Sequence, residues 1–256
     1  MNEPVAWIAA EWPVPAGIVA GCSVRHGGVS QGNYASLNLG AHVADDAAAV
    51  RENRARFRTQ CGLPSEPRWL SQAHGTTVAV DPVADSPATA DAAFTRDSAV
   101  VCAVLSADCL PVLFASTDGG ELAIAHAGWR GLNAGVLEAT VGQFSVPTAD
   151  LRVWLGPAIS QAAFEVGSEV RDAFITNDAD VADCFVANQH GRWQADLYAL
   201  ARHRLAQVGI NRVYGGNFCT YTESGRFFSH RRDGECGRMA SFIYRVAGPD
   251  DALEIG

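Results

Sequence analysis

The sequence contains no lysine: all 19 of its basic residues are arginine, set against 28 acidic residues. This absence excludes every chemistry that needs a lysine amine, such as a Schiff base, a pyridoxal phosphate anchor, a P-loop lysine or a lysine general base. Any anion must therefore be bound by arginine, histidine, backbone N–H groups or a metal ion. The formal net charge of −9 argues against a nucleic-acid partner, which would need a basic face.

The sequence also lacks long apolar runs, paired cysteine motifs and an N-terminal targeting signal. No apolar run approaches the ~20 residues of a membrane-spanning helix, and residues 1–11 carry two acids and no basic residue, so we expect neither a membrane partner nor a secretory signal. The seven cysteines include no CxxC pair, which favours free thiols in the cytoplasm over a disulfide framework. Five are expected to be small buried apolar side chains: Cys22, Cys61, Cys102, Cys184 and Cys219.

Short apolar segments and helical patterns are mixed along the chain without a strict strand–helix–strand rhythm. The stretch 81–91, with its two prolines, is interpreted as a surface loop between strands. This mixture favours an α+β or layered sandwich fold over a doubly wound sheet. Strands are predicted at 76–80, 99–105, 111–116, 121–126, 151–155, 211–214 and 240–246, and helices at 45–61, 131–144 and 194–208.

Three segments place a potential metal ligand where an apolar strand gives way to a turn. They are LSQAHG with His74, LSADCLP with Cys109 and IAHAGWRG with His126. Two imidazoles and one thiolate are the ligand count of a catalytic zinc site, which keeps its fourth position open. Each residue alone has an ordinary structural role open to it, as a turn histidine, a core thiol or a core histidine. The three together favour a site, with Asp108 as a candidate proton shuttle or hydrogen-bond partner of a ligating histidine.

Two further segments could bind an anion. HAGWRGLNAG follows a strand and opens a helix, so Arg130 lies either at an anion cradle or in a tight solvated turn. The run FFSHRRDGECGR holds three of the nineteen arginines within eight positions, which is typical of a charged surface loop or of a phosphate clamp. The glycine-rich segment near the N-terminus lacks the spacing of a dinucleotide-binding motif.

Together these motifs resemble the YfiH-type laccase-domain family, also called the polyphenol oxidase family. Its members are described as purine nucleoside phosphorylases with adenosine deaminase activity, and bacterial members as peptidoglycan editing factors. The resemblance implies one domain over residues 1–256, folded as a layered α/β/β/α sandwich with mixed sheets. The matching motifs run in order from about residue 23 to 245: RHGGVSQGNYASLNLG, NRARF, LSQAHGTTV, ADCLPVLF, HAGWRGL, LGPAIS, FEVG and FFSHRRDGECGRMASFI.

The resemblance also implies site residues. His74, Cys109 and His126 become the metal ligands, with zinc the usual ion and copper possible. In the family pattern an aromatic residue is usual at the position of His230, and a threonine at the position of Cys236. We interpret Cys236 as a side chain that fills the volume of that threonine, not as a fourth metal ligand. The implied pocket residues are Arg25, Asn38, Gln72, Arg130, Arg231, Arg232 and Arg238.

Zinc-dependent chemistry on purine nucleosides is the leading hypothesis: phosphorolysis of adenosine, inosine and methylthioadenosine, and deamination of adenosine. The alternative is an amidase that removes wrong amino acids from UDP-MurNAc peptidoglycan precursors at the same metal. Copper oxidation of phenols is less favoured, because a multicopper site needs many imidazoles and the chain has seven histidines without a His-x-His pair. A metal-free hydrolase with Cys109 as nucleophile and His126 as base is a fourth hypothesis.

The partners expected from this resemblance are small molecules, either a purine nucleoside with phosphate or a muramyl nucleotide. The oligomeric state is left open between a monomer and a weak dimer. Because the chain has no lysine, the charge that binds phosphate must come from zinc and from arginines that converge on it. The expected arginines are Arg25, Arg130, Arg231, Arg232 and Arg238.

Overall fold

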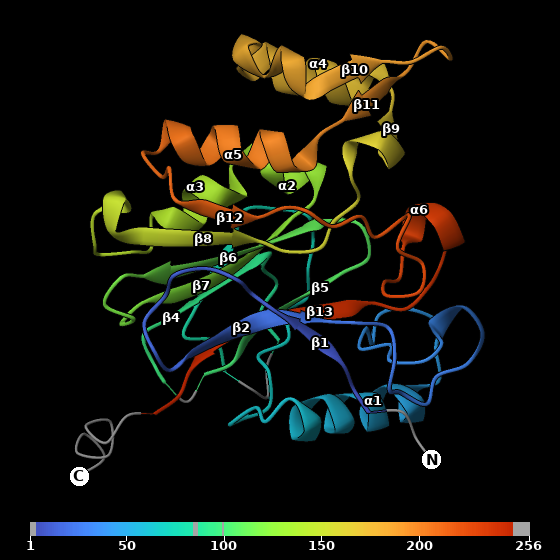
Figure 1. The fold of residues 1–256 in the computed structure, drawn as a ribbon, viewed down its shortest axis with the longest axis vertical. Coiled ribbons are helices and arrows are strands. Elements are labelled where there is room, and N and C mark those ends of the chain that lie inside the picture. Colours follow the sequence, from blue (N-terminus) through green and yellow to red (C-terminus); the bar gives the residue numbers. More distant parts are fainter. Residues whose placement is uncertain (1–3, 84–86, 99, 248–256) are drawn as a thin grey trace.

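The computed structural model describes residues 4–83, 87–98 and 100–247. Its layers follow one another along the long axis of the molecule: a group of helices, a six-stranded sheet, a four-stranded sheet and a single helix (Figure 1). The layered sandwich of helices and mixed strands expected from the sequence is therefore confirmed. No helix in the described part of the chain is long and apolar enough to cross a bilayer.

The six-stranded sheet is mixed. Its central pairs are antiparallel, whereas each edge strand pairs in parallel with its neighbour. In spatial order its strands are β12 (Val213–Gly215), β8 (Leu151–Leu155), β6 (Leu110–Ser116), β7 (Leu122–Ala127), β4 (Ala92–Thr95) and β3 (Val78–Val80).

The four-stranded sheet is antiparallel throughout. In spatial order its strands are β1 (Trp7–Ala9), β2 (Ile18–Ser23), β13 (Met239–Arg245) and β5 (Cys102–Ser106). Helix α1 (Ala47–Gln60) covers its outer face, where Phe57 packs edge-on against Phe242 with ring centroids 5.4 Å apart. Asp46 caps the first turn by accepting from the Ala48 N–H.

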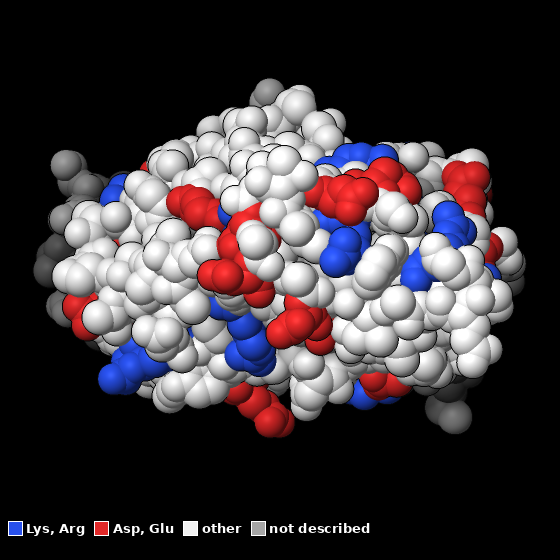
Figure 2. All heavy atoms as spheres, turned by 90° about the horizontal axis from the view of Figure 1, so that it is seen from above, with Lys and Arg blue, Asp and Glu red and all other residues white. Residues whose placement is uncertain are grey.

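The outer face of the six-stranded sheet is covered by α2 (Trp129–Ala134), α3 (Val136–Val141) and α5 (Leu197–Gln207). Beyond them lies a cap made of α4 (Ser168–Asn177) and the small sheet β10 (Phe185–Ala187), β11 (Trp193–Ala195) and β9 (Glu165–Val166). Figure 2 looks onto this end, where acidic and basic side chains are interspersed. The short helix α6 (His230–Asp233) lies beside the two large sheets (Figure 1).

Alternation along β6 and β7 decides where the candidate ligands lie. Val112 and Phe114 pack toward the helices, whereas Leu113 and Ile124 pack between the two large sheets. Because side chains of a strand alternate with period two, His126 lies on the same side as Ile124. The end of β7 therefore places this imidazole between the sheets, where they open toward solvent.

Most predicted elements exist, with shifted ends. The helix predicted over 131–144 is broken at Gly135, whose φ of 100° ends α2 and begins α3. The pattern over 194–208 begins as strand β11 and becomes helical only at Leu197. Residue 99 of one predicted strand and residues 84–86 of the predicted loop lie outside the described residues. The interpretation of 81–91 as a surface loop is wrong for Asp91, which is 1% exposed.

Candidate metal centre

Three separate elements bring the candidate ligands together. His126 ends β7, Cys109 lies in the turn between β5 and β6, and His74 lies in the loop before β3. One ligand atom from each of the three residues lies within 4.8 Å of the other two. The two imidazole rings meet edge to face with centroids 4.9 Å apart. The sequence prediction that these residues share one site agrees with this geometry.

A buried carboxylate, Asp91, holds two of the ligands in place. Its oxygens accept from the N–H groups of Ala73, His74 and Gly75 at 3.1, 2.9 and 2.7 Å, so the loop wraps around it and His74 takes a φ of 58°. Its Oδ1 also lies 2.9 Å from Nδ1 of His126. A carboxylate can only accept, so Nδ1 carries a proton, and Nε2 is the nitrogen left to bind a metal, which would displace any proton on it.

The charges of the site favour a thiolate. Burial alone would raise the pKa of the Cys109 thiol, but the charge and hydrogen bond of His126 and those of His74 outweigh it and lower the pKa to about 6. Burial would likewise lower the pKa of His126, but Cys109 and Asp91 raise it to about 9. Thiolate is the form of cysteine that binds metals.

The arrangement fits a metal ion with soft ligands. Zinc bonds to sulfur at ~2.3 Å and to imidazole nitrogen at ~2.0–2.1 Å, which puts tetrahedral ligand atoms about 3.3–3.7 Å apart. The three ligand atoms lie within 4.8 Å of one another, and a bound ion would draw them closer together. Gly128 completes the cradle, because a Cβ there would lie 3.0 Å from Cδ2 of His74 and 3.1 Å from Sγ of Cys109. Three ligands leave a fourth position for a substrate or water.

The three ligands line a cavity of about 580 Å³ between α1, the ends of the large sheets and α6. Two arginines, Arg54 and Arg238, and two further histidines, His42 and His230, also line it. None of the described residues that line it is Asp or Glu, although the protein as a whole is acidic. Burial, and then the charges of Arg238 and Arg54, lower the pKa of His42, so its ring is neutral at pH 7.

A family model described as multi-copper polyphenol oxidoreductase laccase matches residues 19–246. The chain belongs to this laccase family. Despite the family's name, the part of the chain that the structure describes holds one group of three or more candidate metal ligands, the His74, Cys109 and His126 site. The arrangement is that of a single metal site.

Relatives of this laccase-family chain match it almost from end to end. The purine nucleoside phosphorylase YfiH of Escherichia coli (strain K12) is 51% identical over 243 residues, which cover 93% of this chain and 98% of that protein. The crystal structure of a Neisseria meningitidis protein aligns with a TM-score of 0.90 at 48% identity, over 94% of this chain and 99% of that one. YlmD from Geobacillus stearothermophilus aligns with a TM-score of 0.87 at 31% identity, over 96% and 98%.

Of the two uncharged residues expected in the pocket of this laccase-family chain, Gln72 lines the cavity and Asn38 does not. The amide of Gln72 pairs with the backbone of Leu105 through bonds of 2.9 and 2.8 Å, so it anchors the His74 loop to β5. Asn38 lies behind the cavity, where its amide oxygen accepts from the backbone N–H of Arg238. The carboxylate of Asp108 accepts from Thr220 at 2.6 Å and from the Arg231 N–H at 2.7 Å. The histidine partner is therefore Asp91, not Asp108.

The expected convergence of five arginines is corrected by the structure: only Arg238 lines the cavity. Arg25 and Arg232 bind backbone carbonyl groups of neighbouring loops. Arg130 is exposed on α2 and stacks on Trp129, and Arg231 donates to the backbone of Glu165. Cys236 is fully buried in a cluster with Phe227, Phe228 and Met239, which agrees with its interpretation as a filler.

Sequence reasoning missed Asp91, Arg54 and His42. Arg54 lies inside the NRARF motif, which contributed to the family resemblance but was assigned no role. His42 follows the glycine-rich N-terminal segment, and Asp91 directly precedes β4. A charged residue beside the apolar strand AAFT is the one local signal that could have singled out Asp91.

Proposed function

We propose that this protein is a zinc-dependent purine nucleoside phosphorylase that works at the His74, Cys109 and His126 site. The observation that carries the proposal is the convergence of these ligands on the wall of a cavity whose described lining contains arginine and no carboxylate. Such a cavity favours an anionic substrate next to a metal. We infer a purine nucleoside as the second substrate from the relatives. They are named purine nucleoside phosphorylases and are about half identical to this chain over nearly its whole length.

The cavity has room and donors for both substrates. Its volume of about 580 Å³ is within the range of small-molecule sites, ~300–1,000 Å³. Nη1 and Nη2 of Arg54 and Nη2 of Arg238 have no acceptor among the described residues, whereas Nε of Arg54 donates to Leu39 and Nη1 of Arg238 to Cys236 and Gly237. These free guanidinium nitrogens are the groups we assign to phosphate.

In phosphorolysis a phosphate oxygen forms a bond to C1′ of the ribose while the bond from C1′ to the purine nitrogen breaks, and the electron pair passes to the purine. Arg54 and Arg238 would hold the phosphate and orient its attacking oxygen. The charges of Arg238 and Arg54 help to keep the ring of His42 neutral. This ring would accept a proton from a substrate hydroxyl or from phosphate. A Zn²⁺ held by His74, Cys109 and His126 would supply a Lewis acid at the fourth position.

Zinc suits the ligand set better than copper chemistry does. One thiolate and two imidazoles are zinc ligands in open catalytic sites. Oxidation of phenols by a multicopper centre would need more histidines than one group of three ligands contains. Metal analysis of the purified protein should therefore give about one equivalent of zinc, and the Cys109→Ala variant should retain almost none.

The test is product analysis with adenosine, inosine and methylthioadenosine, each with and without phosphate. We expect free purine and ribose 1-phosphate only when phosphate is present, and ammonia from adenosine if the same site also deaminates. Cys109→Ala should abolish both products, whereas the matched variant Cys184→Ala, a cysteine outside the site, should keep full activity. Release of an amino acid from a muramyl nucleotide with no turnover of nucleosides would replace this proposal by the amidase.

A further inference from the structure

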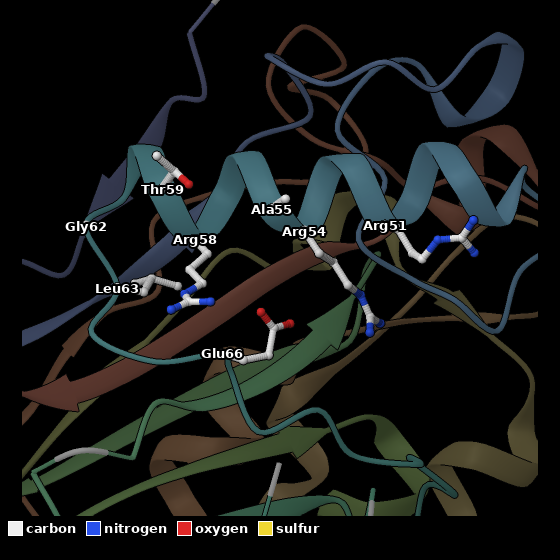
Figure 3. A pocket seen from close by; sticks show the side chains of 8 residues that line it. All are labelled: Arg51, Arg54, Ala55, Arg58, Thr59, Gly62, Leu63 and Glu66. Atoms are coloured by element: carbon white, nitrogen blue, oxygen red, sulfur yellow. The ribbon is translucent and has the colours of Figure 1, made fainter. Parts of the chain in front are cut away.

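We propose that the groove beside α1 is a second anion site, outside the metal centre, and that it binds the phosphate chain of an oligophosphate. The groove has a volume of about 680 Å³ and runs between α1 and the segment that follows it. Figure 3 shows Arg51, Arg54 and Arg58 leaving α1 on the side that faces Glu66. The lining residues are Arg51, Arg54, Ala55, Arg58, Thr59, Gly62, Leu63 and Glu66.

Two of the three arginines of the groove are not used by the protein itself, and the third, Arg54, donates its Nε to Leu39 and stacks on Trp69. The side chains of Arg51 and Arg58 have no acceptor or ion-pair partner within residues 4–83, 87–98 and 100–247. By contrast Arg56, on the same helix but outside the groove lining, pairs with Glu52 at 2.7 Å. The single carboxylate of the groove, Glu66, already accepts from Nε1 of Trp69 at 2.8 Å. Glu66 keeps its negative charge, but three guanidinium groups against one carboxylate still leave an excess of positive charge in an acidic protein.

The spacing of the arginines decides the class of anion. At ~1.5 Å of rise per residue, Arg51 and Arg54 are about 4.5 Å apart along the axis of α1, and Arg54 and Arg58 about 6 Å. They lie on one face of the helix, because residues three and four apart are neighbours there. One phosphate group can meet two of these side chains, whereas a chain of two or three phosphates can meet all three. An oligophosphate is therefore favoured over orthophosphate.

Arg54 connects the groove with the metal cavity, since it lines both. Its guanidinium stacks on Trp69, 4.2 Å from the ring centroid, and Trp69 also lines the metal cavity. An anion bound in the groove would therefore draw on the same free nitrogens that we assign to phosphate in the cavity. If the proposed phosphorolysis holds, an oligophosphate should raise the KM for phosphate, which is a readout separate from binding itself.

Calorimetric titration of the purified protein with tripolyphosphate, ATP and orthophosphate tests the groove directly. Tripolyphosphate should bind more tightly than orthophosphate, and Arg51→Ala/Arg58→Ala should weaken its binding at least about tenfold. The matched control Arg56→Ala should bind it as the unchanged protein does. The Cys109→Ala variant should also retain binding, because the groove does not include the metal ligands.

The titrations with ATP and with tripolyphosphate distinguish two possible ligands. Equal affinity for the two would indicate an inorganic oligophosphate, and tighter binding of ATP would indicate a nucleotide. Equal binding by the doubly substituted variant and the unchanged protein would overturn the proposal, as would loss of binding in Cys109→Ala or equal affinity for orthophosphate. Circular dichroism of each variant checks that it is folded. None of these titrations requires phosphorolysis, so the groove and the proposed function fail separately.

Discussion

Asp91 is the residue on which the geometry of the metal centre depends most. One buried carboxylate fixes the backbone of the His74 loop and the ring of His126 through four hydrogen bonds. Burial raises the pKa of Asp91, but the His126 hydrogen bond and the N–H groups of Gly75 and Ala73 outweigh it and lower the pKa below its ordinary value. The carboxylate is thus charged when it orients the ligands.

Asp91→Asn keeps the shape of the side chain and removes its charge, so it tests orientation without opening a cavity. We expect zinc affinity to fall about 10–100-fold, the effect usual for a partner that orients a ligating histidine. Competition with a chromogenic chelator measures this affinity. The control is Asp172→Asn, whose side chain is 65% exposed and far from the ligand set in the fold. Unchanged affinity in Asp91→Asn would show that the ligands need no such support.

Gly128 tests whether the ligands converge as tightly as the structure shows. Its φ of −63° and ψ of 156° are open to any residue, so alanine brings no backbone strain. The added Cβ would instead push His74 and Cys109 apart by a few tenths of an ångström. Gly128→Ala should therefore weaken zinc binding at least about tenfold with little change in thermal stability. Gly225→Ala, where a Cβ would meet nothing within 4 Å, should leave both unchanged.

At the scale of elements, the sequence predicts what depends on local pattern. The helix predicted over 45–61 exists as α1 over 47–60, with Asp46 as its N-cap. Strand 151–155 is predicted to the residue. The short strands β1 and β2 and the helix α4 were not predicted. IVAGCS in β2 mixes small and polar residues, and it pairs with the neighbouring strand β1 and with β13, which is remote in sequence.

In the candidate site, too, the sequence predicts what depends on local pattern and misses what depends on tertiary contacts. His74, Cys109 and His126 could be found because each is a potential metal ligand beside a short apolar segment of the sequence. Arg54 and His42 could not, because only tertiary packing brings them to the cavity. Asp91 has one local signal, its charge beside β4, but its role depends on contacts with the His74 loop and with His126 that the sequence does not show. Four of the five arginines expected there lie elsewhere, since clustering in sequence does not fix the direction of a side chain.

Asn53 connects α1 to the glycine-rich N-terminal segment. It is fully buried, and its amide donates to Ser30, Ser36 and Asn38 while its oxygen accepts from the Val29 N–H. Asn53→Ala removes these four hydrogen bonds from a buried region, so we expect a loss of about 2–4 kcal/mol in the free energy of unfolding. Urea unfolding followed by fluorescence measures it. Exposed Arg58→Ala, on the same helix, should change stability by less than about 0.5 kcal/mol.

For the molecule as a whole, the absence of lysine shapes the fold as well as the site. Several arginines each bind two or more backbone carbonyl groups, which the five donors of a guanidinium allow and a lysine amine would do less rigidly. Arg232 binds the carbonyls of Thr220, Tyr221 and Phe227, and Arg202 those of Val213 and Gly215. The net charge therefore says little about where positive charge is available.

Acid stability follows from buried carboxylates such as Glu121. Burial would raise its pKa, but the hydrogen bonds of Ser145 and the guanidinium of Arg96 hold the pKa below 4.5. A carboxyl group with a lowered folded-state pKa stabilises the protein above the unfolded pKa, and this contribution is lost as pH falls through the folded pKa. At pH 7 Glu121→Gln should lower the free energy of unfolding by about 1–3 kcal/mol.

The difference between this variant and the unchanged protein should shrink as pH falls below about 4, where the unchanged protein also loses the charge. Denaturant unfolding at a series of pH values measures it. Glu52→Gln, which removes an exposed ion pair with Arg56, should have almost no effect at any pH. A pH-independent difference for Glu121→Gln would contradict the assigned charge.

The dependence of activity on one bound zinc is tested most directly by titrating metal back into protein treated with a chelator. Phosphate-dependent release of purine should return in proportion to zinc and reach a plateau at about one equivalent per chain, with no recovery in Cys109→Ala. Full activity in the metal-free protein, or recovery that needs several copper ions per chain, would contradict a single zinc site formed by His74, Cys109 and His126.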